Sequence, residues 1–368
     1  MSKRIKILFT IPNFDTAGSG KVVYDLVKGL DKTRFEPEIC CFHNRGVYFD
    51  TIKTLGVKIH IFQFTAPYRP LLSLPFRVIK IARFFKKQNF DLIHSWHWSS
   101  DFTEPLAAKL VGIPFVYTKK AMGWGNKAWR WRSQLSTRII AINRDMLDYF
   151  VGMEHKVESI PLGVDVDYFQ PLDKSYEIPS GQKFSTKDFI IVSIANLVAV
   201  KGIEVLLNAV KQLNDKNIKV LIVGSDHGNY AETLKLHYKS EKHIVFLGKQ
   251  LDIKPYLAVA NIFVIPTKDE GRKEGMPIAP LEAMASNRIV IGSNISGIKD
   301  ILESKKELLF EPSNIDDLAE KIKYVMGLNQ SEVTKMQQEF RNLAVQKFSI
   351  LSFIINYQLF YKELLKVE

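Results

Sequence analysis

The feature that most constrains this chain is a regular alternation between short, almost continuously apolar runs and segments of helical length. Many of the runs are rich in Val, Ile, Leu and Phe, which is typical of strands buried on both faces of a sheet. Alternating strands and helices predict parallel sheets covered by helices. The predicted strands are residues 5–11, 37–43, 57–62, 90–96, 114–119 and 138–143 in the first half, and 189–196, 218–224, 243–248, 261–266 and 288–293 in the second.

A polar segment separates the two halves. Residues 172–188 contain proline, glycine and several serine, threonine and lysine residues, the composition of a domain boundary. We therefore expect two doubly wound, Rossmann-like α/β domains, residues 1–170 and 171–345, that face a central cleft. Segment 346–368 has the pattern of an amphipathic helix, which we expect to pack back on the first domain. Ligands of such sheets bind beyond the carboxyl ends of the strands.

The composition indicates which classes of partner and which cellular compartment to expect. The formal net charge is +12, which favours anionic partners such as nucleic acid, anionic lipid or phosphorylated substrates. The two cysteines, Cys40 and Cys41, are adjacent in an apolar run, so a disulfide framework is excluded and a reducing, cytoplasmic setting is expected. The first apolar run is short and ends at Pro12, so we interpret it as a strand and not as a signal peptide. No run approaches the ~20 apolar residues of a membrane-spanning helix.

The turn after the first predicted strand, Gly18-Ser19-Gly20, resembles the end of a phosphate-binding P-loop. That motif requires glycine where this chain has Asp15 and Ser or Thr where it has Val22, so the pattern argues against a nucleoside triphosphatase. A strand, a glycine turn and a helix can still direct backbone amides toward an anion. The alternative is a tight turn that only reverses the chain.

The most specific stretch is residues 273–302, where a loop after a predicted strand carries Glu274 and the following helix carries Glu282. We place Pro277 in the first turn of that helix. Carboxylates only accept hydrogen bonds, which suits them to pairs of sugar hydroxyls. One carboxylate is then expected at the cleft and the other on a second part of the same ligand. The alternative for Glu282 is an ordinary surface position.

This arrangement resembles the Glu-seven-Glu motif of the retaining family-four glycosyltransferases, which have the GT-B fold of two facing Rossmann-like domains. The resemblance implies that Glu274 contacts the donor sugar and is catalytic. It implies that Glu282 binds the ribose of the nucleotide. The adjoining loop residues expected at the donor are Gly275, Met276 and Pro277.

A second segment, residues 194–202, resembles the family stretch in which an Arg and a Lys bind the donor diphosphate. Lys201 matches the lysine, whereas the arginine position is occupied by Asn196. Lysine alone is a point charge without the bidentate fork of arginine. Arg272 and Lys273, beside Glu274, are candidates to supply the missing cation.

The resemblance also gives roles to the first domain. It implies that Gly18, Ser19 and Gly20 lie against the donor diphosphate and the acceptor. A family histidine near the reacting carbon corresponds to His94 or His97, and we prefer His97 because His94 falls within the predicted strand. The spacing of the two histidines could suggest a metal pair, but no further His/Cys cluster supports one, and the resemblance implies no metal ion and no other cofactor.

We therefore expect a retaining hexosyltransferase that uses a nucleoside diphosphate sugar and a glycan or lipid-linked acceptor in the assembly of cell-surface polysaccharide, lipopolysaccharide or glycolipid. Two alternatives remain. A non-hydrolysing sugar-nucleotide epimerase would need acid/base groups at both faces of one sugar carbon. A nucleic-acid-binding protein is favoured by charge alone, because no aromatic-basic recognition module is present, and we expect no nucleic-acid partner.

Residues 77–90 form a basic amphipathic segment with two interpretations. A helix of this kind can lie on an anionic membrane, which would make the protein peripheral on the inner face of the cytoplasmic membrane. The other interpretation is a domain-surface helix whose apolar face is part of the core.

Overall fold

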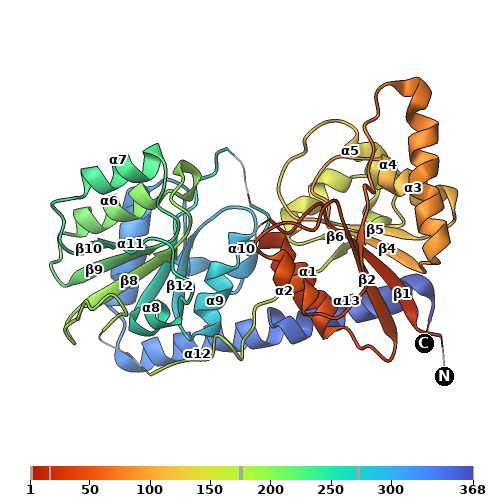
Figure 1. Ribbon diagram of the computed structural model, residues 1–368. Coiled ribbons are helices and arrows are strands. Elements are labelled where there is room, and N and C mark those ends of the chain that lie inside the picture. Colours follow the sequence, from red (N-terminus) through yellow and green to blue (C-terminus); the bar gives the residue numbers. More distant parts are fainter. Residues whose placement is uncertain (1–2, 16–17, 174–176, 272–273, 368) are drawn as a thin grey trace. The chain divides into compact units, whose positions relative to one another are not determined.

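The computed structural model describes residues 3–15, 18–173, 177–271 and 274–367 (Figure 1). The chain divides into two compact units. Unit 1 comprises residues 1–162 and 353–368, and unit 2 comprises residues 163–352. The boundary therefore lies after Leu162 and not after residue 170, and the end of the chain is part of unit 1.

Unit 1 contains a seven-stranded sheet in which all pairs are parallel, in the order β3-β2-β1-β4-β5-β6-β7. Its strands are β1 (Ile5–Thr10), β2 (Phe35–Cys41), β3 (Ile59–Ile61), β4 (Leu92–Ser95), β5 (Phe115–Lys119), β6 (Arg138–Ala141) and β7 (Val157–Ser159). Its helices are α1 (Gly18–Gly29), α2 (Phe49–Lys53), η1 (Leu71–Ser73), α3 (Leu74–Gln88), α4 (Thr103–Leu110), α5 (Trp129–Leu135), η2 (Arg144–Phe150), η3 (Glu154–Lys156) and, from Phe353 onward, α13 (Ile350–Leu365).

Strand alternation in unit 1 sends successive side chains to opposite faces of the sheet. On one face, Leu8 and Ile93 join a buried cluster with Val78, Ile81 and Phe85 of α3. On the other face, Phe9 packs against residues that include Tyr361 of α13, as expected for a sheet covered on both sides (Figure 1). The helix at the end of the chain is thus part of the core of unit 1.

Unit 2 contains a six-stranded, all-parallel sheet in the order β10-β9-β8-β11-β12-β13. Its strands are β8 (Phe189–Ile194), β9 (Ile218–Val223), β10 (Ile244–Phe246), β11 (Ile262–Ile265), β12 (Ile289–Ser293) and β13 (Leu309–Phe310). Its helices are η4 (Ala199–Lys201), α6 (Ile203–Leu213), α7 (Asn229–His237), α8 (Lys254–Val259), α9 (Ala279–Ala285), α10 (Ile298–Ile301), η5 (Lys306–Leu308), α11 (Ile315–Met326) and α12 (Gln330–Lys347).

All the strands predicted from the sequence are present, and the prediction of two doubly wound parallel sheets is confirmed. The short edge strands β7 and β13 were not predicted. Each sheet has one position where its strand order reverses direction. This switch point lies between β1 and β4 in unit 1 and between β8 and β11 in unit 2. In open α/β sheets the ligand site lies beyond the carboxyl ends of the strands that flank the switch point.

Candidate active site

The loops that follow β8 and β11 carry Lys201 and Glu274, so both residues belong to the switch point of unit 2. The β8 loop ends in the turn η4, and Gly202, with φ of +62°, is the N-cap of α6. A Cβ atom on Gly202 would lie 2.1 Å from the carbonyl oxygen of Pro266, so only glycine allows the two loops to approach this closely. The backbone N–H of Lys268 also donates to Val200 O, over 2.8 Å, and the two loops therefore form one packed structure.

Within this structure Lys201 and Glu274 form an ion pair, with 2.6 Å between Nζ and Oε1. The lysine side chain is 14% exposed and the carboxylate is 48% exposed. An ammonium group has three N–H donors, so Lys201 can hold Glu274 and still donate to an anion. Because only Gly202 separates Lys201 from the first residue of α6, the lysine charge adds to the positive end of that helix.

The Glu274 loop is closely packed behind its carboxylate. Gly275, Met276 and Pro277 are buried, and a Cβ on Gly297, whose φ is +80°, would lie 2.2 Å from Gly275 O. These buried residues can present backbone groups to a ligand more readily than side chains. The placement of Pro277 in the first helical turn was wrong, because α9 begins at Ala279 and its early proline is Pro280. Pro277 ends the loop instead.

Glu282 lies in α9 and is partly exposed. Burial, followed by the carboxylates of Asp252 and Glu282 among others, raises the pKa of Tyr168. The Tyr168 hydroxyl also donates to Asp252 over 3.3 Å. The carboxylate of Glu282 is therefore close enough to influence Tyr168, which is itself hydrogen-bonded to Asp252.

The structure describes some of the positions at which the sequence predicted a second cation near Lys201, and it adds one that was not predicted. Asn196 is exposed just after β8, where the resemblance placed an arginine. Arg272 and Lys273 lie outside the described residues. Sequence analysis missed Lys268, whose ammonium group pairs with Glu204 and lies 3.3 Å from Glu270. Its Cγ lies next to Gly202, so Lys268 is a further cation beside the Lys201 turn.

In unit 1, residues 18–20 follow β1 and lie at the second switch point. The expectation that Gly18, Ser19 and Gly20 form a turn was wrong, because these residues are the first turn of α1 itself. The first backbone N–H groups of a helix have no partner within it, so a role in anion binding stays a prediction. Gly20 is buried, and a Cβ there would lie 3.0 Å from Phe14 Cδ1, which gives this glycine a packing role.

The two candidate histidines differ in their surroundings. His94 lies inside β4 and is fully buried, where Nδ1 is 2.6 Å from the Tyr361 hydroxyl and Nε2 is 2.8 Å from Thr118 Oγ1. His97 lies beyond the end of β4, is 9% exposed, and has Nδ1 3.1 Å from Ser99 Oγ. Burial lowers the pKa of each imidazole to about 3. His97 lies beyond the strand, and its contact with the donor stays a prediction.

Sequence analysis missed a buried polar network that joins the ends of β1 and β4. Glu104 of α4 accepts hydrogen bonds from Thr10 and, over 2.8 Å, from Ser95, the last residues of those strands. Arg132 of α5, also fully buried, lies 3.4 Å from Glu104 and donates to Asp101 O. Burial raises the pKa of Glu104 to about 7, opposed mainly by the Arg132 charge. The network fixes both ends of the loop that carries His97.

Lys120 is a second missed residue at this switch point. It follows β5, and its ammonium group donates to Ser19 Oγ over 2.9 Å and to the carbonyl of Trp96. Burial, reinforced by the charge of Arg132, lowers the pKa of Lys120 to about 7. No sequence signal links residues 19, 96 and 120, because their proximity depends on the strand order.

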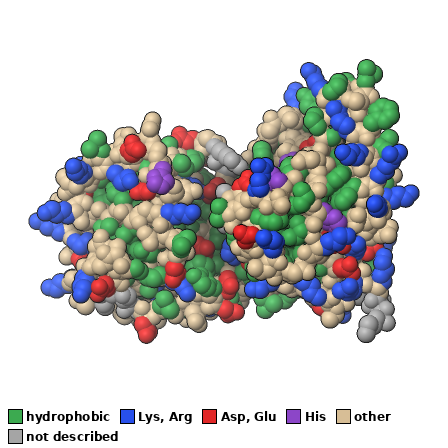
Figure 2. Space-filling view, viewed as in Figure 1, with side chains coloured by type: hydrophobic (Ala, Val, Ile, Leu, Met, Phe, Trp, Pro, Cys, Tyr) green, Lys and Arg blue, Asp and Glu red, His purple; other side chains and the backbone are tan. Residues whose placement is uncertain are grey.

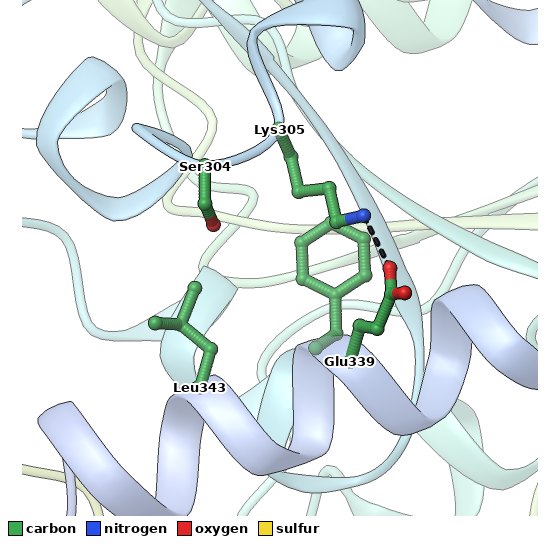
Figure 3. Close-up of a pocket in the computed structure, with 5 residues that line it drawn as sticks. Ser304, Lys305, Glu339 and Leu343 are labelled. Carbon is green, nitrogen blue, oxygen red and sulfur yellow. Dashed lines mark hydrogen bonds and ion pairs between the residues drawn. The ribbon is translucent and has the colours of Figure 1, made fainter.

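A pocket beside α12 lies away from the predicted site. It is lined by Ser304, Lys305, Glu339, Phe340 and Leu343, and contains none of the predicted site residues. In Figure 3 the Lys305 ammonium points to Glu339, with which it pairs. Within the described residues, no cluster of three or more His, Cys, Asp or Glu side chains has a metal-binding arrangement, and no helix combines the length and hydropathy needed to cross a bilayer.

Two doubly wound, all-parallel α/β units are the architecture of the GT-B fold. Comparison with known proteins agrees. Residues 16–168 match the family Glycosyltransferase Family 4, and residues 175–344 match the family Glycosyl transferases group 1. The chain belongs to these family-four, group 1 glycosyltransferases.

Several relatives and structures are similar to this chain. An Escherichia coli UDP-Gal:alpha-D-GlcNAc-diphosphoundecaprenol alpha-1,3-galactosyltransferase is 24% identical over 74% of this chain and 76% of its own. The capsular polysaccharide biosynthesis glycosyltransferase CapH of Staphylococcus aureus is 23% identical over 85% and 95%. A Rickettsia africae glycosyltransferase structure has a TM-score of 0.85 at 21% identity, covering 99% of this chain and 100% of that one. An Anabaena protein crystallised with UDP and glucose has a TM-score of 0.75 at 16% identity, covering 98% and 100%.

Proposed function

We propose that the protein transfers a hexose-type sugar from a nucleoside diphosphate sugar to a hydroxyl group of a glycan or lipid-linked acceptor, with retention of the anomeric configuration. Unit 2 binds the nucleotide of the donor. Unit 1 binds the acceptor and also contributes donor contacts from His97 and the start of α1. The observation that carries this proposal is the Lys201–Glu274 pair at the switch point of unit 2, followed by Glu282 in α9.

The chemistry follows from the groups at this switch point. Departure of the donor diphosphate places growing negative charge on the phosphate oxygens, and a fixed donor in the right place lowers such a barrier by ~3–4 kcal/mol. Lys201 and the first amides of α6 supply those donors. The Glu274 carboxylate accepts from sugar hydroxyls, and Glu282 accepts from the ribose. Both acids bind, in contrast to glycosidases, where two carboxylates lie across the scissile bond.

Retention is proposed to occur by front-face attack, without a covalent enzyme intermediate. In this scheme the acceptor hydroxyl forms the new glycosidic bond as the bond to the diphosphate breaks, and the departing phosphate takes the hydroxyl proton. The stabilising cations are side chains, so we propose that no metal ion is required. Turnover in excess EDTA should equal turnover in added magnesium, and a tenfold difference between the two would contradict this point.

The acceptor class is proposed from the relatives. The Escherichia coli relative acts, by its name, on a diphosphoundecaprenol-linked sugar, and the Staphylococcus aureus relative acts in capsular polysaccharide biosynthesis. We propose a related role in cell-surface glycan assembly. The buried, free thiols of Cys40 and Cys41 are consistent with work in the reducing cytoplasm.

A two-stage experiment tests the function. The full chain is first screened by thermal shift against UDP-, GDP-, ADP- and CMP-sugars, and at least one is expected to stabilise it. The stabilising donor is then incubated with diphosphoundecaprenol-linked sugars, and the anomeric configuration of the product is read by NMR. Conversion of the donor sugar without acceptor would favour an epimerase. Salt-sensitive oligonucleotide binding with no donor response would favour a nucleic-acid-binding protein.

A further inference from the structure

The start of α3 exposes a cluster of large apolar side chains, here called the apolar tip and made of Leu71, Leu72 and Phe76. These side chains are 68%, 93% and 74% exposed. Tyr68 and Ile79 beside them are 51% and 39% exposed. Single exposed apolar residues are common on proteins, but several adjoining ones mark an interaction surface.

The tip is held in place by its own backbone. Arg77 donates from its guanidinium to Arg69 O over 3.2 Å and to Pro70 O over 2.8 Å. The Ser73 hydroxyl donates to the same Pro70 carbonyl. These bonds tie the segment before η1 to α3, so the exposed leucines belong to a fixed turn.

The stretch of sequence that carries the tip and α3 has basic residues and no acidic ones. No Asp or Glu occurs between Asp50 and Asp91 in the sequence. The exposed basic residues of this stretch on and beside α3 are Arg69, Lys80, Arg83, Lys86 and Lys87. Figure 2 shows hydrophobic and basic side chains together over the end of unit 1 where Figure 1 places the start of α3.

The interpretation of residues 77–90 as a helix lying with its apolar face on a membrane was wrong. Val78, Ile81 and Phe85, which make up that face, are buried in the core of unit 1. On α3, the groups that remain for membrane contact are the tip and the outward cations. This moves the expected contact from the side of the helix to its beginning.

We propose that the apolar tip inserts into the interfacial layer of an anionic phospholipid bilayer while the cations of α3 contact the lipid headgroups. Apolar insertion and a basic patch are each weak signals, and their combination gives stable peripheral binding. An anionic bilayer matches both halves of this surface, whereas nucleic acid would use the cations and leave Leu71, Leu72 and Phe76 in water. The inference deepens the proposed function by locating where a lipid-linked acceptor is met.

The test is sedimentation of the full chain with vesicles. Wild-type protein is expected to bind phosphatidylglycerol-containing vesicles at least about tenfold more tightly than pure phosphatidylcholine vesicles, and less tightly in 0.5 M salt. The double variant Leu72→Asp/Phe76→Asp should lose at least about tenfold in affinity, and Lys80→Glu/Arg83→Glu should do the same. Matched controls on unit 2 are the exposed Leu236→Asp and Lys216→Glu/Lys239→Glu, which should bind like wild type.

Thermal unfolding without ligand shows whether each variant folds. The proposal is overturned if wild-type protein does not bind anionic vesicles, if the tip variant binds as well as wild type, or if the unit 2 controls lose as much affinity as the tip variant. An oligonucleotide that binds equally to wild type and the tip variant while vesicles bind neither would also overturn it. Donor thermal shift is measured separately, so failure of membrane binding and failure of the proposed transferase activity are distinguishable.

Discussion

The Lys201 ammonium lies 2.6 Å from the Glu274 carboxylate, although the two residues come from different loops of unit 2. Each loop follows one of the two strands that flank the switch point, and Gly202 allows their backbones to touch. In the proposed reaction these two side chains bind neighbouring parts of one donor. Their contributions to catalysis should therefore depend on each other.

Replacing either member of this pair is expected to lower kcat/KM by about 10²-fold or more. Loss of Lys201 removes a contact that strengthens as the diphosphate departs, and loss of the Glu274 charge weakens the hydrogen bonds that position the donor sugar. The variants are Lys201→Met and Glu274→Gln. The double variant should lose less than the product of the two single losses, because residues in contact couple. Steady-state kinetics on all three variants measures this, with Lys211→Met, exposed on α6, as the control. Fully additive losses would mean that the two side chains act separately.

Glu282→Ala is expected to raise the dissociation constant of the nucleotide about tenfold while kcat changes little. A carboxylate that binds the ribose contributes equally to the ground state and the transition state, so its loss appears in KM. Calorimetry with the free nucleoside diphosphate and steady-state kinetics measure the two effects. The matched control is Glu232→Ala, an exposed acid on α7. A lower kcat with unchanged nucleotide affinity would assign Glu282 to another role.

The sequence predicted much of this architecture because buried parallel strands leave long apolar runs. β7 contains Glu158 and Ser159 beside a single valine, and β13 has only two residues, so neither produces an apolar run. The short edge strands β3 and β10 could be predicted because each lies within a longer apolar run. The start of α1 was misplaced because glycines favour a turn interpretation, whereas packing of Gly20 against Phe14 favours the helix here.

Some residues of the candidate site could also be predicted from the sequence, and others could not. Lys201, Glu274 and Glu282 belong to continuous motifs, so the sequence could point to them. Lys120 and Lys268 could not be found, because each is a single lysine whose neighbours are set by strand order and loop packing. The pairing of Glu104 with Arg132 depends in the same way on the contact between α4 and α5.

His94 makes stability depend on pH. Its pKa is about 3 in the folded protein, below the ordinary value of 6.5, so acid protonates the unfolded chain first. The free energy of unfolding should therefore fall as the pH drops from about 6.5 toward 3, by at most ~1.4 kcal/mol per pH unit for this group. His94→Gln should flatten this dependence in urea titrations, whereas the exposed control His155→Gln should not. An unchanged slope in His94→Gln would show that other groups cause the acid sensitivity.

His97→Ala is expected to lower turnover about tenfold or more while leaving the fold intact, because the side chain lies beyond β4 and is proposed to contact the donor. The pKa of His97 is about 3, so the imidazole is neutral at any pH used for assay. The pH–activity profile of the wild-type enzyme should therefore show no rise or fall between pH 6 and 7 that is caused by His97. His237→Ala, exposed on α7, is the control, and full activity in His97→Ala would remove His97 from the site.

Lys120 should give the activity a pH dependence near neutrality. Burial lowers its pKa to about 7, so the ammonium next to Ser19 is charged below pH 7 and neutral above it. If this charge helps the first turn of α1 to hold a phosphate, kcat/KM for the donor falls as the pH rises from 6 to 8. Lys120→Met should be flat across that range and low throughout, and the exposed control Lys127→Met should follow wild type.

Unfolding of the protein cannot explain this fall in kcat/KM at higher pH. Between pH 7 and the ordinary lysine pKa of 10.5 the unfolded chain keeps the proton that folded Lys120 has released, so this group makes the folded state more stable as the pH rises. Falling activity alongside rising stability over pH 7 to 8, both abolished in Lys120→Met, would identify the residue by two independent measurements. A wild-type profile that is flat from pH 6 to 8, or one that Lys120→Met leaves unchanged, would exclude Lys120 from phosphate binding.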